Sequence, residues 1–166
     1  MSEANRGARG VVPSQGAGMS EVRSPVLPAA APVVNPDTAE FWKATAEGTF
    51  LGRRCGDCEA AIWYPRPICP FCHSSNTRWE EFTGRGAVYS YSVVHRAGGA
   101  WKGVTPYVLA YVELEEGPRV MTNIVDCDVD AVAIGDAVEV VFEDTGEGSA
   151  LPRFRPVQSS EEVGQA

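Results

Sequence analysis

The sequence predicts a mainly β protein with one short N-terminal helix, a cysteine-rich module and a small C-terminal barrel. Two Cys-x-x-Cys pairs lie close together, at residues 55–58 and 69–72, which is typical of a small metal-binding module. After Gly86 the chain is rich in β-branched and aromatic residues, which indicates β-strands. The 17 glycines and 12 prolines among 166 residues indicate many turns. These observations favour short strands joined by tight turns.

The chain divides into five expected segments. Residues 1–34 are rich in Ala, Gly, Pro and Ser and show no periodicity, which is typical of a disordered arm. The opening Met-Ser-Glu recurs at Met19, which makes Met19 an alternative start. The expected segments are a disordered arm at 1–34, an N-terminal helix at 35–48, a cysteine module at 49–83, a barrel at 84–157 and a flexible tail at 158–166.

The helix is predicted from its end signals. Asn35 is the expected N-cap, Pro36 fits the first helical position, and Gly48 ends the helical pattern. The helix places Phe41 and Trp42 on one face. Both side chains are too apolar to stay in water, so they either pack against the cysteine module or belong to a surface that binds a partner.

Four cysteines predict one metal centre: Cys55, Cys58, Cys69 and Cys72. Each Cys-x-x-Cys turn aims two sulfurs at a common point, and two such turns complete a tetrahedron with Zn–S distances of about 2.3 Å. Four thiolates leave no coordination position open to water, so such a site supports structure and performs no chemistry. Two disulfides or an iron–sulfur centre are the alternatives. We expect a zinc ribbon with one structural Zn²⁺.

The predicted compartment supports zinc. Residues 1–34 lack the apolar core of about 7–15 residues that a secretory signal carries, and no run approaches the roughly 18 apolar residues of a membrane span. We therefore expect a cytoplasmic protein without membrane contact, in which thiols stay reduced and clustered cysteines bind metal. Cys127 is the fifth cysteine, and we interpret it as a partly buried thiol without a catalytic role.

The C-terminal half predicts a small closed barrel. Gly84-Arg85-Gly86 is expected to form the turn that enters it, and strand 107–114, apolar on both faces, is expected to be central. Closure removes the exposed edges of a small sheet, so an OB-type barrel fits best and an SH3-like barrel is the alternative. The five expected strands are 88–95, 107–114, 119–125, 137–142 and 153–156.

The order of short motifs over residues 35–157 resembles a known family. This family consists of small proteins with an N-terminal helix, a rubredoxin-like zinc ribbon and a C-terminal OB-fold, which accompany thiolases and related acyl-CoA enzymes. One departure is Glu59, because many relatives have glycine after the second cysteine. The matching motifs are Phe41-Trp42, the strand before Cys55, Pro65-Arg66 before Cys69-Pro70, Gly84-Arg85-Gly86, Tyr89-Ser90-Tyr91, Pro106-Tyr107, Val112-Glu113-Leu114, Ile134-Gly135 and Phe154-Arg155-Pro156.

The resemblance implies a partner role. Such proteins bind thiolase-fold subunits (thiolases, acyltransferases, or retro-aldol aldolases that cleave steroid CoA thioesters), and the catalytic groups belong to those subunits. It implies a non-catalytic accessory subunit that scaffolds the complex and helps to hold the acyl-CoA substrate, with two copies of each chain. Lipid metabolism, including steroid degradation, is the implied setting. For partner binding we single out Phe41, Trp42, Tyr64 and Arg66.

The loop after the first barrel strand is the candidate contact for CoA. Arg96, Trp101 and Lys102 could meet the adenine and phosphates of CoA or a partner surface, because loops on a rigid barrel commonly bind ligands. The alternative is an ordinary solvated loop. His95 is interpreted as a strand histidine and not as an acid–base group. Three arginines of this half are expected to pair with carboxylates rather than with phosphates: Arg119, Arg153 and Arg155.

Two other classes of function remain as alternatives. An OB-fold joined to a zinc ribbon also binds single-stranded nucleic acid through stacked aromatic rings, which Tyr89, Tyr91, Tyr107 and Tyr111 could supply. Phosphate binding needs Lys and Arg, but residues 104–166 carry three of these against thirteen Asp and Glu. A catalytic role of the chain alone is the other alternative, although no Ser/His/Asp set, open metal position or glycine-rich phosphate loop is evident. We predict no nucleic-acid partner.

Overall fold

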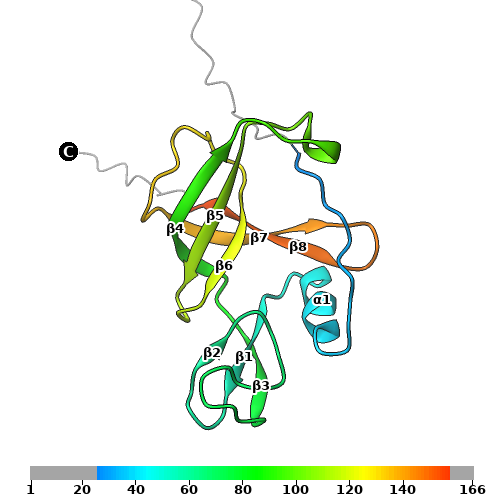
Figure 1. Ribbon diagram of the computed structural model, residues 1–166, viewed down its shortest axis with the longest axis vertical. Helices are drawn as coiled ribbons and strands as arrows, with labels where there is room; N and C mark the ends of the chain where they lie inside the picture. The colour runs from blue at the N-terminus through cyan, green and yellow to red at the C-terminus, as the bar shows by residue number, and fades with distance from the viewer. Residues whose placement is uncertain (1–25, 158–166) are drawn as a thin grey trace, which may run out of the picture.

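The computed structural model describes residues 26–157 and contains two β modules flanked by one helix (Figure 1). The helix, α1, packs beside a three-stranded ribbon of order β2-β1-β3, and the other strands close a barrel of order β4-β5-β6-β8-β7. Within these residues the mainly β architecture and the five-stranded barrel are confirmed. The elements are α1 Ala39–Ala46, β1 Leu51–Cys55, β2 Ala61–Ile62, β3 Thr77–Glu81, β4 Arg85–Val94, a 3₁₀ turn at Gly99–Trp101, β5 Tyr107–Leu114, β6 Arg119–Ile124, β7 Ala137–Asp144 and β8 Ala150–Pro156.

The helix begins later than the sequence predicts. Residues 36–38 form a turn, and Thr38 is the N-cap of α1. The Asn35 carboxamide oxygen accepts hydrogen bonds from the Thr38 backbone N–H at 3.1 Å and from the Thr38 hydroxyl at 3.0 Å. Asn35 therefore closes the turn that leads into the helix, which is why its sequence signal resembles an N-cap.

Phe41 is the centre of an aromatic cluster that joins the helix to the ribbon. Its side chain is 0% exposed, and its ring centroid lies 4.7 Å from Trp42, 5.3 Å from Trp63 and 5.6 Å from Tyr64. The cluster continues through Phe50 into the barrel core. Phe41 thus belongs to the internal core, and its contact with a partner remains a prediction.

The barrel core is formed by one face of each strand. Val108 and Val112 of β5 point inward, together with Val138 of β7 and Phe154 of β8, and all four are almost completely buried. The β6–β8 contact is parallel and the others are antiparallel. Strand β5 lies between β4 and β6 as expected, but its outer face is exposed rather than buried on both sides.

The expected entry turn at Gly84-Arg85-Gly86 lies at the start of the first barrel strand: Gly84 directly precedes β4, and Gly86 is its second residue. Gly84 has φ +68°, a left-handed conformation that favours glycine. A Cβ on Gly86 would overlap the carbonyl oxygen of Glu113 on β5. The close approach of β4 to β5 at Gly86 therefore requires a residue without a side chain.

The segment before the helix packs against the barrel. Leu27 is buried, and the Arg153 Nη2 donates hydrogen bonds to the carbonyl oxygens of Leu27 at 3.4 Å and Pro28 at 2.7 Å. Burial lowers the pKa of the Arg153 guanidinium. The expected disordered arm therefore does not extend over residues 26–34, whereas residues 1–25 and the expected tail at 158–166 lie outside the described residues.

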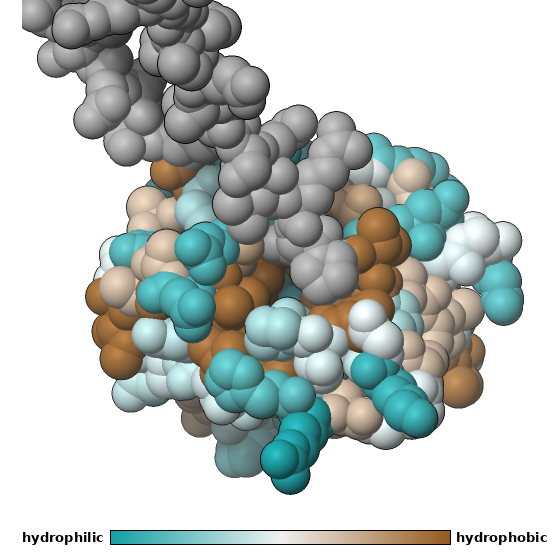
Figure 2. All heavy atoms as spheres, turned by 90° about the horizontal axis from the view of Figure 1, so that it is seen from above, coloured by the Kyte–Doolittle hydropathy of each residue, from teal (hydrophilic) through white to brown (hydrophobic). Residues whose placement is uncertain are grey.

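The surface combines polar and apolar residues. Seen from the end of the barrel remote from the ribbon, hydrophobic side chains gather in several clusters between hydrophilic ones (Figure 2). None of the helices formed by residues 26–157 has the length and apolar character needed to cross a bilayer.

Candidate metal centre and flanking surfaces

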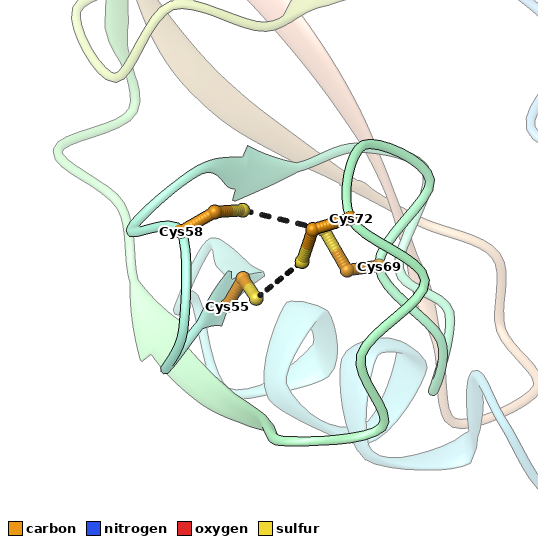
Figure 3. Close-up of side chains that lie close together, drawn as sticks. All are labelled: Cys55, Cys58, Cys69 and Cys72. Atoms are coloured by element: carbon orange, nitrogen blue, oxygen red, sulfur yellow. Dashed lines mark hydrogen bonds between the residues drawn. The ribbon is translucent and has the colours of Figure 1, made fainter.

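The four predicted cysteines converge on one point between the ribbon loops (Figure 3). The Sγ atoms of Cys55 and Cys72 lie 3.5 Å apart, those of Cys58 and Cys69 lie 3.6 Å apart, and all four lie within 4.8 Å of one another. A tetrahedron with Zn–S distances of about 2.3 Å requires S···S separations of about 3.8 Å. The arrangement therefore fits a tetrathiolate zinc centre, and none of the four is in a disulfide.

The ribbon strands and their loops hold the sulfurs in place. Cys55 ends β1, and its N–H donates to the Ala60 carbonyl at 3.0 Å. On the second loop the Cys69 N–H donates to the Ser74 carbonyl at 2.9 Å, and the His73 N–H donates to the Cys69 carbonyl at 3.0 Å. Cys55 and Cys69 are fully buried while Cys58 and Cys72 lie at the surface. Each loop thus contributes one inner and one outer thiol.

Crowding of the four thiols separates their pKa values. Burial opposes ionisation of Cys69, but backbone N–H groups of Cys72 and Phe71 and neighbouring thiols outweigh it and lower the pKa of Cys69 to about 7. The Ser74 N–H favours the Cys72 thiolate, but the neighbouring thiols raise the pKa of Cys72 to about 12. A cation at the centre would stabilise all four thiolates together.

The two cysteine loops are tied together by a polar cluster around Asp57. The Asn76 Nδ2 donates to Asp57 Oδ1 at 2.8 Å, and the Ser74 hydroxyl donates to the other Asp57 oxygen. These donors lower the pKa of the Asp57 carboxyl, Ser74 first. Because Asp57 lies between Cys55 and Cys58 while Ser74 and Asn76 follow Cys72, the cluster orients the loops on which the sulfurs sit.

Three of the four residues singled out for partner binding, Phe41, Trp42 and Tyr64, line one pocket, and Arg66 lies outside it. Trp42 is half-buried, Tyr64 and Arg66 are exposed, and Trp42 and Tyr64 line a pocket of about 310 Å³ between α1, the ribbon and the barrel. Burial raises the pKa of the Tyr64 phenol. This pocket brings together residues that are distant in the sequence, including Trp63 and Met121, which the sequence analysis did not identify.

The expected CoA-contact loop lies at the other end of the molecule. The 3₁₀ turn at Gly99–Trp101 is at the end of the barrel opposite to the ribbon (Figure 1). Arg96, Lys102 and His95 are exposed, whereas the Trp101 ring packs against Tyr107 at 4.8 Å. The structure therefore groups Arg96 and Lys102 away from Tyr64 and Arg66, and a role of this loop in CoA binding remains a prediction.

Two of the three arginines form the expected ion pairs. Arg119 lies 3.4 Å from Glu113, and Arg155 lies 2.7 Å from Glu139. Arg153 instead donates to backbone carbonyls. Cys127 is partly buried, as expected, and its Sγ lies 3.7 Å from the Ile124 carbonyl oxygen.

The fold and the metal centre define a zinc ribbon joined to an OB-type barrel. Family models match both modules: the rubredoxin-like zinc ribbon domain of ChsH2 over residues 42–78, and the C-terminal OB-fold domain of ChsH2 over residues 79–143. The chain belongs to this ChsH2-like, DUF35 family. The match to a zinc ribbon domain and the four converging thiols together indicate one structural Zn²⁺.

The chain is similar to a scaffold protein and to subunits of enzymes. The chain is 41% identical to a DUF35 domain-containing scaffold protein of Methanothermobacter thermautotrophicus over 72% of this chain and 96% of that one. It is 30% identical to the benzoylsuccinyl-CoA thiolase subunit BbsA of Geobacter metallireducens over 65% of this chain and 71% of that one. A solved structure described as the Ltp2-ChsH2(DUF35) aldolase matches with a TM-score of 0.68 and 36% identity, covering 76% of this chain and 98% of that chain.

Proposed function

We propose that this chain is a non-catalytic accessory subunit of a thiolase-fold enzyme that acts on acyl-CoA thioesters. The likeness to the Ltp2-ChsH2(DUF35) aldolase, over 98% of the matched chain, carries this proposal. The names of the other relatives, a scaffold protein and a thiolase subunit, support it. The thiolase-fold partner performs the reaction, and this chain holds the complex together and helps to position the acyl-CoA.

The chemistry of the described residues supports a role without catalysis. A tetrathiolate zinc centre has no open position at which water or a carbonyl could be activated. Within residues 26–157 both histidines, His73 and His95, are exposed, and neither imidazole has a hydrogen-bonded Ser, Asp or Glu that would make it part of a nucleophilic set. Cleavage or formation of a carbon–carbon bond next to a thioester therefore requires groups from the other subunit.

The complex that we propose contains two copies of each chain and acts on a steroid CoA thioester. Homo-oligomers are most often two-fold dimers, so a dimeric partner would bind two copies of this chain, one on each side. A steroid side-chain CoA thioester is the substrate that we propose for the complex, with cleavage by a retro-aldol reaction. Arg96, Trp101 and Lys102 are the residues that we propose to contact CoA.

A single-stranded nucleic acid is the second candidate ligand, because Tyr89, Tyr91 and Tyr111 are exposed on the barrel. The Tyr89 face is covered, however, by the Arg119 guanidinium at 3.5 Å from the ring centroid. The few cations among the residues of the barrel half oppose phosphate binding. Binding of single-stranded DNA that weakens steeply with salt would support this candidate.

Co-purification tests the proposed function. Tagged full-length chain is co-expressed with each thiolase-fold protein of the same organism, beginning with the one encoded nearest to it, and the eluate is analysed by size-exclusion chromatography with light scattering. We expect one stable heteromer with two copies of each chain. Elution of this chain alone, with every thiolase-fold candidate expressed and folded, would contradict the proposal.

A further inference from the structure

Two pockets flank Trp63 at the junction between the ribbon and the barrel. The first, of about 310 Å³, includes Trp63, Tyr64 and Met121. The second, of about 400 Å³, includes Trp63, Phe71 of the second cysteine loop and Arg119 at the start of β6. Because Trp63 lines both, the pockets belong to one surface that crosses from the ribbon to the barrel.

Exposed apolar side chains connect these pockets with the outer face of the barrel. Met121 is 62% exposed and Phe71 is 68% exposed, and each lines one of the pockets. Met121 on β6 is the register partner of Tyr111 on β5, which is 46% exposed. Paired residues in neighbouring strands point to the same side of a sheet. Tyr89, also 46% exposed, reaches this face through its contact with Arg119.

We call these residues the junction face: Trp63, Phe71, Tyr89, Tyr111, Arg119 and Met121. An extended group of exposed large apolar side chains is typical of a protein–protein contact, in which aromatic residues, methionine and arginine are enriched. A specific interface of about 800 Å² on each partner is larger than a single small pocket. A face that spans both modules can supply such an area, and the contacts of Phe41 with Phe50 and of Phe50 with Phe154 fix the two modules relative to one another.

Charge indicates what kind of partner this face fits. Beside it, Glu113 on β5 pairs with Arg119 at 3.4 Å, and the β5–β6 turn adds the carboxylates of Glu115 and Glu116. The whole chain has a formal net charge of −8. Two copies meeting through this face would bring like charges together, whereas a different protein with lysines and arginines around an apolar projection would complement it.

We propose that the junction face is where the thiolase-fold subunit docks, inserting apolar side chains into the two pockets on either side of Trp63 and placing basic residues opposite the β5–β6 turn. This inference rests on the proposed function and adds to it the surface, the anchoring pockets and the charge of the partner's complementary face. The loop at Gly99–Trp101 lies at the far end of the barrel and is outside this contact (Figure 1).

Exposed-residue variants test the docking surface. Met121→Asp and Tyr111→Asp put a carboxylate into the junction face, and Glu115→Lys reverses one charge beside it. The matched control is Ile134→Asp, because Ile134 is 70% exposed and lines neither pocket. Affinity for the co-purified thiolase-fold subunit is measured by calorimetry, with circular dichroism and zinc content as controls for folding.

The expected result is a loss of affinity of about tenfold or more for Met121→Asp and for Tyr111→Asp, in keeping with the effect of central interface residues. Glu115→Lys should weaken binding most at low salt, where charge attraction is least screened. Ile134→Asp should bind as the wild type does. Wild-type affinity in both aspartate variants, with the heteromer intact, would overturn this inference and leave the proposed function standing.

Absence of any heteromer and self-association of the chain would each contradict a different part of the account. If the wild-type chain forms no heteromer with any thiolase-fold subunit, the proposed function fails and the docking inference fails with it. Sedimentation equilibrium of the isolated chain reports self-association. If the wild-type chain dimerises and Met121→Asp makes it monomeric, the junction face binds a second copy of this chain and the inference is overturned.

Discussion

Replacing Cys55 with Ser is expected to release the zinc and unfold β1–β3. Cys55 is fully buried at the end of β1 and is one of four converging thiols. Structural zinc contributes an apparent 10–16 kcal/mol or so to small zinc domains near neutral pH. Around the metal centre the ribbon has few other buried groups, because β2 has two residues and the separate buried cluster there consists of Cys55, Ile62 and Cys69.

The effect is measured as zinc per chain and as loss of ribbon signals in a nuclear magnetic resonance spectrum, where barrel signals from β4–β8 should persist. The matched control is Cys127→Ser, which changes a partly buried cysteine outside the metal centre. It should retain one zinc and the complete spectrum. A Cys55→Ser chain that keeps one tightly bound zinc and an intact ribbon would show that the tetrathiolate does not hold the module together.

Replacing Phe41 with Ala is expected to lower the free energy of unfolding by about 3–5 kcal/mol, the range for large aromatic truncations in a core. The ring is completely buried among Trp42, Trp63 and Tyr64. Its loss leaves a cavity at the place where the helix, the ribbon and the barrel meet. Urea unfolding followed by tryptophan fluorescence measures the change.

The control for Phe41 is an exposed apolar residue. Val157→Ala changes a side chain that is 45% exposed at the end of the barrel, and surface substitutions of this kind usually stay within about 0.5 kcal/mol. If Phe41→Ala were as mild as Val157→Ala, the aromatic cluster would not be the element that fixes the helix to both modules.

The metal centre could be predicted from the sequence because its geometry is local. Two Cys-x-x-Cys turns bring their own sulfurs together, so spacing alone gives the coordination. The barrel strands were also predictable, because runs of β-branched and aromatic residues between turn residues favour strands. Strand β5 was interpreted incorrectly on its outer side, because Leu109 and Tyr111 are apolar and yet exposed. The pattern of apolar residues along a strand does not distinguish a side chain buried in the core from an apolar side chain exposed on the surface.

The pockets could not be predicted because they depend on distant segments. Trp63 of the ribbon and Met121 of β6 line the same pocket because the aromatic cluster fixes the two modules relative to one another. The packing of residues 26–34 depends in the same way on Arg153, whose guanidinium holds the carbonyls of Leu27 and Pro28. The Arg153 contacts join positions more than a hundred residues apart, and no local periodicity predicts either feature.

Reconstituted turnover tests the central claim most directly. The thiolase-fold subunit alone, this chain alone with its zinc bound, and the two together are each incubated with an acyl-CoA thioester, and carbon–carbon bond cleavage or condensation is followed by chromatography of the CoA products. We predict no turnover by this chain, and more turnover by the pair than by the thiolase-fold subunit. Turnover by this chain alone would contradict an accessory role.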